Sequence, residues 1–153
     1  MLDIGVYALS IVRSFMDCCP DQIISQMRPS PTGSDEQATI LLMNQEGQMA
    51  TVALSMHAKQ PKRAMISGEK GYIEIMEYPR AGEAKVTYTD TGKTEIIEAG
   101  DNADALYYEV LDMEHSIIGG DASAMQLSFS KDVMDLMTAF RKEWGVSYPE
   151  EER

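Results

Sequence analysis

Residues 37–57, QATILLMNQEGQMATVALSMH, contain the clearest structural pattern in the chain. Two mostly apolar runs, 37–43 and 49–57, flank the short polar stretch Asn44-Gln45-Glu46-Gly47. Runs of this length bounded by asparagine and glycine are typical of strands joined by a tight turn. The stretch therefore predicts a β-hairpin, with its two strands antiparallel.

The same pattern continues on both sides of this hairpin. Residues 21–28 read as a strand, because Pro29, Pro31 and Gly33 break the pattern after it. Two more hairpins are expected, and their strands are 63–67 with 72–76 and 85–89 with 94–98. Six or seven consecutive strands with short connections predict a mostly antiparallel sheet.

Three segments with helical periodicity complete the predicted elements. Residues 2–16 are apolar almost throughout, and Pro20 follows them as a stop signal. A helix over about 130–144 has one apolar face and ends before Gly145. The helix between them, starting near 101 or 102 and ending at 119–120, has an apolar stripe at helical spacing: Leu106, Val110, Met113 and Ile117. Together these elements predict an α+β fold.

The strands are too apolar for a sheet that exposes one of its faces to solvent. Residues 38–43 are apolar on both faces, and twelve methionines add adaptable apolar surface. A large exposed apolar face usually marks an interface, so we expect a homodimer through the open sheet face. The alternative is that edge loops cover this face.

Composition narrows the class of protein. The 153 residues suit one domain spanning 1–153, and no run approaches the 18 apolar residues of a membrane span. A net charge of −12 argues against binding nucleic acid or anionic membranes. The adjacent Cys18 and Cys19 make no disulfide framework, which favours a reducing cytoplasm. Neither His57 nor His115 has neighbours at metal-ligand spacing, so we expect no metal site.

The first predicted helix has a polar stripe on an otherwise apolar surface. Asp3 and Tyr7 lie one turn apart, and Ser10 and Ser14 extend the same face. Such a stripe must face a partner, a cavity or water. By spacing alone, Asp3 could simply favour the helix dipole and Tyr7 could be a hydrogen-bonded core tyrosine.

Leu2-Asp3-Ile4-Gly5-Val6-Tyr7 resembles the Asp-x-Gly-x-His/Tyr motif of the Gfo/Idh/MocA oxidoreductase family. The resemblance continues to the C-terminus, where residues 144–149 are similar to the dihydrodiol dehydrogenase and NADP-xylose dehydrogenase branch. In full-length members the motif lies in a second domain, after an NAD(P)-binding Rossmann domain. The resemblance implies that this chain is the second domain alone, an open-faced sheet with helices on one face, like the C-terminal domain of glyceraldehyde-3-phosphate dehydrogenase.

The resemblance also implies a chemistry for the polar stripe. It makes Tyr7 the proton donor or acceptor at the substrate hydroxyl, and Asp3 a residue that orients the substrate. A phenol with the ordinary pKa of about 10 does this well only beside a cation that stabilises phenolate. In the family that cation is a lysine in a Glu-Lys-Pro motif, which this chain lacks, since Glu69-Lys70-Gly71 is a turn.

The residue patterns and the family resemblance together indicate the expected function. The chain has no Gly-x-Gly-x-x-Gly sequence, so we expect no cofactor to bind here, although the resemblance implies NAD(P) for the full-length enzyme. We expect the substrate-binding and oligomerisation domain of an oxidoreductase acting on a sugar, polyol or dihydrodiol, inactive alone. The alternative is a free-standing, self-associating scaffold without enzymatic activity, or the remnant of a split gene.

Overall fold

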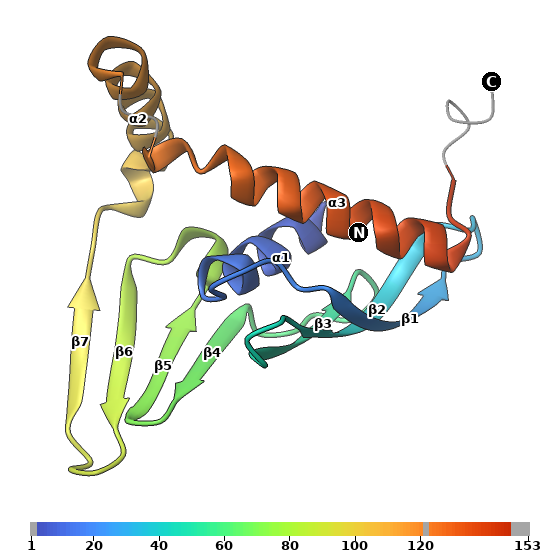
Figure 1. Ribbon diagram of the computed structural model, residues 1–153, viewed down its shortest axis with the longest axis horizontal. Helices are drawn as coiled ribbons and strands as arrows, with labels where there is room; N and C mark the ends of the chain where they lie inside the picture. The colour runs from blue at the N-terminus through green and yellow to red at the C-terminus, as the bar shows by residue number, and fades with distance from the viewer. Residues whose placement is uncertain (1–2, 121–122, 148–153) are drawn as a thin grey trace. The chain divides into compact units, whose positions relative to one another are not determined.

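The computed structural model describes residues 3–120 and 123–147 (Figure 1). The chain divides into two compact units, unit 1 (residues 1–60 and 128–153) and unit 2 (residues 61–127). In chain order the helices and strands are α1 (Ile4–Ser14), β1 (Gln22–Pro29), β2 (Asp35–Met43), β3 (Met49–Ser55), β4 (Arg63–Gly68), β5 (Gly71–Met76), η1 (Tyr78–Arg80), β6 (Glu83–Tyr88), β7 (Thr94–Glu98), η2 (Asn102–Asp104), α2 (Ala105–Gly119), η3 (Ser123–Met125) and α3 (Leu127–Trp144), where η marks a short 3-10 helix.

Unit 1 has one antiparallel sheet with two helices packed on one of its faces. The strand order is β1-β2-β3, and Ile40 pairs with Ser25 on one side and Val52 on the other. The buried side chains of α1, α3 and one face of this sheet form a single core: Ala8, Leu9, Ala38, Ile40, Leu42, Val52, Val133, Leu136, Met137 and Phe140. This core buries one face of α1 and leaves its other face exposed.

The turn between β2 and β3 is held by the buried amide of Asn44. Its Oδ1 accepts hydrogen bonds from the backbone N–H groups of Glu46 (3.1 Å) and Gln48 (2.9 Å). Its Nδ2 donates to Gln48 Oε1 at 2.7 Å and to the carbonyl of Cys18 at 3.4 Å. Asn44 therefore closes the hairpin and ties it to the segment that follows α1.

Unit 2 is a four-stranded antiparallel sheet of order β4-β5-β6-β7, followed by α2. Gly71 allows a close approach between strands, because a Cβ there would lie 2.1 Å from the Thr87 carbonyl oxygen. Among the described residues of unit 2, none is as buried as the unit 1 core.

The structure confirms the α+β class and the antiparallel strands, with boundaries close to those predicted. It differs from the expectation of one continuous sheet, since the described strands form one sheet of three and another of four. Residues 56–62 separate β3 from β4 and include Pro61, which has no N–H to donate to a ladder. Gly120 and Gly145 adopt positive φ angles of 68° and 65° just beyond α2 and α3, as their predicted capping roles require.

Candidate active site

Helix α1 carries both predicted site residues. Asp3 stands at the N-cap position, where its side chain makes no capping hydrogen bond and its carboxylate stays exposed. Tyr7 lies one turn later on the same side, and its side chain is half-exposed at 51%. The structure therefore places these two side chains on one helical face, and Leu2 of the same motif lies outside the described residues.

The stripe continues along α1 in the way that the spacing predicted. Ser10 and Ser14 are exposed as well, and Ser14 Oγ donates a 2.8 Å hydrogen bond to the Ser10 carbonyl. The opposite face of α1 is buried through Gly5, Ala8 and Leu9. Because the buried face fixes the rotation of the helix, the polar stripe points away from the core of unit 1.

Near the end of the stripe, the side chain of Arg13 connects α1 to α3. Its guanidinium Nε donates to Asp132 Oδ2 at 2.8 Å, and its Nη1 donates to the carbonyl of Met16 at 2.8 Å. The guanidinium also lies over the Phe129 ring, 4.1 Å from its centroid. A buried cation with two polar partners and an aromatic ring restrains the rotation of α1. Sequence reasoning missed this role, although an arginine within an apolar helix is the signal that could have revealed it.

The segment after α1 is also fixed. Gln48 Oε1 accepts from the Asp17 backbone N–H at 2.9 Å, and Gln48 Nε2 donates to Asp17 Oδ2 at 3.1 Å. Cys18 and Cys19 are free thiols. Burial raises the pKa of the Cys19 thiol, and the nearby Asp132 carboxylate raises it further, so Cys19 is not an activated nucleophile. Within residues 3–120 and 123–147, no cluster of three potential ligands could hold a metal ion.

The local arrangement can orient a small polar molecule. An exposed carboxylate and an exposed phenol, one turn apart on an anchored helix, can accept hydrogen bonds from, and donate them to, neighbouring hydroxyl groups.

None of the helices in the described part of the chain is long and apolar enough to cross a membrane.

Comparison with known proteins agrees with the sequence motif. Residues 1–74 match the GFO/IDH/MocA C-terminal domain family. The matched stretch includes the Asp3–Tyr7 segment and ends within β5. No curated protein matches the chain.

Several solved structures share the fold. UDP-N-acetylglucosamine 3-dehydrogenase GnnA from Acidithiobacillus ferrooxidans has a TM-score of 0.67 and 18% identity, covering 78% of this chain and 38% of its own. KijD10, a 3-ketoreductase from Actinomadura kijaniata solved with TDP-benzene and NADP, has a TM-score of 0.66 and 15% identity, covering 86% and 42%. Aldose-aldose oxidoreductase from Caulobacter crescentus, complexed with glycerol, has a TM-score of 0.60 and 20% identity, covering 91% and 43%.

This chain thus spans less than half the length of each of these three proteins. The match over residues 1–74 carries the motif, and the wider α+β fold agrees with it. Residues 1–74 are therefore similar to the GFO/IDH/MocA C-terminal domain family.

Proposed function

We propose that this chain supplies the substrate-facing half of an NAD(P)-dependent oxidoreductase. The observation that carries the proposal is the Asp3–Tyr7 pair, which resembles the family motif, falls within the matched residues 1–74 and lies on the exposed face of an anchored helix. In this proposal Tyr7 moves a proton at the substrate oxygen that becomes, or ceases to be, a carbonyl. Asp3 accepts a hydrogen bond from a substrate hydroxyl and so orients the substrate.

We propose that another domain holds the cofactor, because the described connection from β7 to α2 does not fit a dinucleotide. Binding of a pyrophosphate needs glycines and free N–H groups where a strand leads into a helix. Here the connection from β7 to α2 contains Asp101 and Asp104, and Asp101 Oδ1 already accepts from the Ala103 N–H at 2.9 Å. Two carboxylates at this position repel a phosphate, so no step is assigned to a cofactor bound by this chain.

The substrate class that we propose is a sugar, a polyol or a dihydrodiol. Its support is that the names of the fold relatives include a dehydrogenase of a UDP-sugar, a 3-ketoreductase, and an aldose-aldose oxidoreductase complexed with glycerol. We also propose the dihydrodiol dehydrogenase and NADP-xylose dehydrogenase branch, on the resemblance at residues 144–149. Tyr148 and Pro149 of that segment lie outside the described residues.

The role of Tyr7 can be tested in a fusion that places a dinucleotide-binding domain before Met1. If Tyr7 moves the proton, Tyr7→Phe lowers kcat by about 100-fold or more and changes KM little. Tyr107→Phe is the matched control, because Tyr107 is also exposed but lies in α2. Equal activity of the Tyr7 variant and the unmodified fusion would overturn the assignment.

The chain alone is proposed to be inactive, which a titration with NADPH tests. The expected result is no saturable binding at micromolar concentration and no turnover of sugars or polyols. Micromolar binding, or turnover by the isolated chain, would contradict the proposal.

We further propose that the chain forms a homodimer in the cytoplasm through the open face of the unit 1 sheet. On this face the paired strands expose Ile24 at 68% and Met49 at 72%, with Leu41 beside Ile24. These residues lie opposite the core face, which buries Ile40 and Leu42. Sedimentation would show a dimer that Ile24→Lys dissociates, whereas a monomer at micromolar concentration would contradict this interface and the scaffold alternative alike.

A further inference from the structure

Helix α2 displays an apolar stripe that its own unit leaves uncovered. The stripe side chains have exposed fractions from 49% to 73% and are Leu106, Val110, Met113 and Ile117. Their spacings of four, three and four residues are the alternation of a heptad seam, with Leu106 and Met113 at d positions and Val110 and Ile117 at a positions. Exposed apolar stripes with this spacing are how helices pair with other helices.

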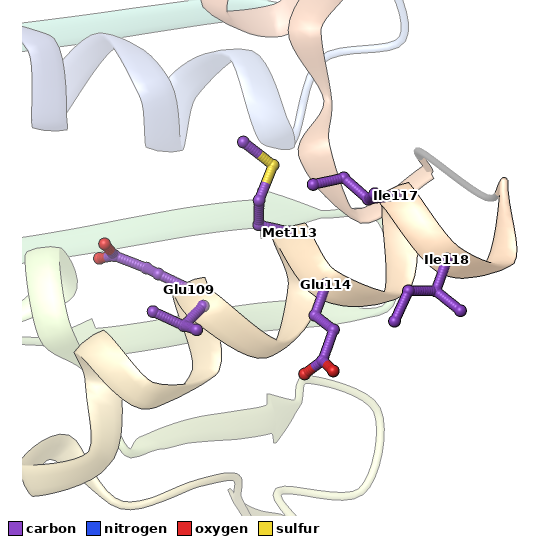
Figure 2. A pocket seen from close by; sticks show the side chains of 6 residues that line it. Glu109, Met113, Glu114, Ile117 and Ile118 are labelled. Carbon is purple, nitrogen blue, oxygen red and sulfur yellow. The ribbon is translucent and has the colours of Figure 1, made fainter.

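A groove of about 450 Å³ runs along the same helix. Its apolar lining is Val110, Met113, Ile117 and Ile118, and the two remaining lining residues are Glu109 and Glu114 (Figure 2). Figure 2 shows the carboxylates of Glu109 and Glu114 extending away from α2, on different sides of Met113. The apolar stripe in the groove, Val110, Met113 and Ile117, is therefore flanked by Glu109 on one side and by Glu114 on the other.

The positions of these two acids determine which helix can pair with α2. With Met113 at d and Val110 at a, Glu114 occupies an e position and Glu109 a g position. These positions flank the seam and set partner choice through their charges. The surrounding sequence offers no compensating cation, because residues 94–130 contain neither lysine nor arginine.

A second copy of α2 is a poor partner for this surface. In a parallel pair of α2 helices, Glu109 would face Glu114 of the other copy, and in an antiparallel pair like positions would face each other. Both arrangements bring carboxylates together beside a desolvated seam, which is unfavourable. Charge complementarity instead requires a partner with cations at the same flanking positions.

We propose that α2 is a docking helix for a basic amphipathic helix, one with an apolar heptad seam and lysine or arginine at its e and g positions. The partner's apolar side chains fill the groove over Val110, Met113 and Ile117. Its flanking cations pair with Glu109 and Glu114. This contact is made by α2 of unit 2, whereas the proposed substrate face and the open sheet face belong to unit 1.

The test uses the full chain and two synthetic 21-residue peptides. Both have leucine at a and d, while one has lysine and the other glutamate at e and g. Fluorescence anisotropy of the labelled peptides at low salt is expected to show at least tenfold tighter binding of the lysine peptide. Glu109→Lys combined with Glu114→Lys is expected to reverse that preference, whereas equal binding of both peptides to the unmodified chain overturns the proposal.

Two variants separate docking in the groove from the general attraction of an acidic protein. Glu98→Lys combined with Asp112→Lys makes the same change in net charge away from the seam, and is expected to keep the preference for the lysine peptide. Ile117→Asp adds a negative charge but breaks the apolar floor, and is expected to lose the lysine peptide. Retained binding by Ile117→Asp, or an equal loss in the Glu98 and Asp112 variant, overturns the proposal.

Two further measurements address other occupants of the groove and keep the test independent of variant folding. Sedimentation of the unmodified chain would overturn the proposal if a dimer dissociates on Ile117→Asp, because a second copy would then occupy the groove. Ile117→Cys is expected to react with a thiol reagent as fast as an unfolded peptide. If Ile117→Asp leaves the oligomeric state unchanged, strong protection of that cysteine would show that the chain covers its own groove, and would also overturn the proposal.

Discussion

Replacing Arg13 by alanine should destabilise unit 1 and loosen the helix that carries Asp3 and Tyr7. Arg13 is the only described side chain that makes a salt bridge between α1 and α3, and it also contacts a ring of α3. Removing it leaves Asp132 without its cation and Met16 O without that donor. The proposed substrate face then depends on apolar packing alone to fix the rotation of α1.

The size of the effect follows from the burial of the pair. Breaking a fully buried ion pair costs about 3–5 kcal/mol, and the side chain of Arg13 is only 9% exposed. Asp132 is 25% exposed, so water compensates part of the loss and lowers the expected cost to about 2–3 kcal/mol. The contact with Phe129 adds about 0.5–1 kcal/mol. We expect Arg13→Ala to lower the free energy of unfolding by about 3 kcal/mol.

Urea unfolding followed by the fluorescence of Trp144 measures this change. Trp144 is the only tryptophan of the chain and lies in unit 1, where its ring stacks on Phe140 at a centroid distance of 5.7 Å. Its Nε1 donates to Ser25 Oγ at 2.9 Å, so the emission reports on α3 against the sheet. A double-mutant cycle with Asp132→Ala should give a coupling free energy of about 1–2 kcal/mol.

A neighbouring ion pair provides the matched control. Lys131 and Asp135 form a salt bridge one turn apart on α3, but their side chains are 75% and 62% exposed. Exposed pairs at this spacing contribute only about 0.3–0.5 kcal/mol, so the cycle on this pair should give a small coupling. A loss below about 0.5 kcal/mol for Arg13→Ala, or equal couplings in the two cycles, would show that burial does not strengthen the Arg13–Asp132 pair.

Two further predictions concern the sheet of unit 2 and the thiol of Cys19. Gly71→Ala should separate β5 from β6, because its Cβ would meet the Thr87 carbonyl oxygen, whereas Gly68→Ala, with its nearest atom at 3.7 Å, should be tolerated. Hydrogen exchange of the Thr87 amide should speed up only in the Gly71 variant, and equal protection in both variants would contradict the close approach. Burial and Asp132 raise the pKa of Cys19, so in a Cys18→Ser variant iodoacetamide should react with it more slowly at pH 8 than with the unfolded chain. The Cys19 thiol keeps its proton to a higher pH in the folded state than in the unfolded state. The free energy of unfolding therefore falls as pH rises above the pKa of the unfolded thiol. An alkylation rate equal to that of the unfolded chain would contradict both expectations.

Most of the secondary structure could be predicted from the sequence because its signals are local. The hairpin at Asn44–Gly47 combines a turn residue and a glycine between two apolar runs, and the structure places β2 and β3 on either side of it. The common face of Asp3 and Tyr7 follows from helical periodicity alone. The motif around them led to the family that the comparison confirmed, whereas their chemical roles stay a prediction.

Other features depend on contacts between distant residues. Arg13 forms its hydrogen bond with Asp132, which lies 119 residues away in the sequence. The local sequence around either residue does not predict this pairing. The division of the strands into two sheets was not predicted either, because the strand pattern alone does not say where ladder pairing stops. Local preferences select helices, strands and turns, so these elements and the motif can be inferred from the amino-acid sequence without knowledge of the packing. The buried faces and the long-range partners emerge only when the chain packs, because burial and long-range hydrogen bonds join residues that are distant in sequence.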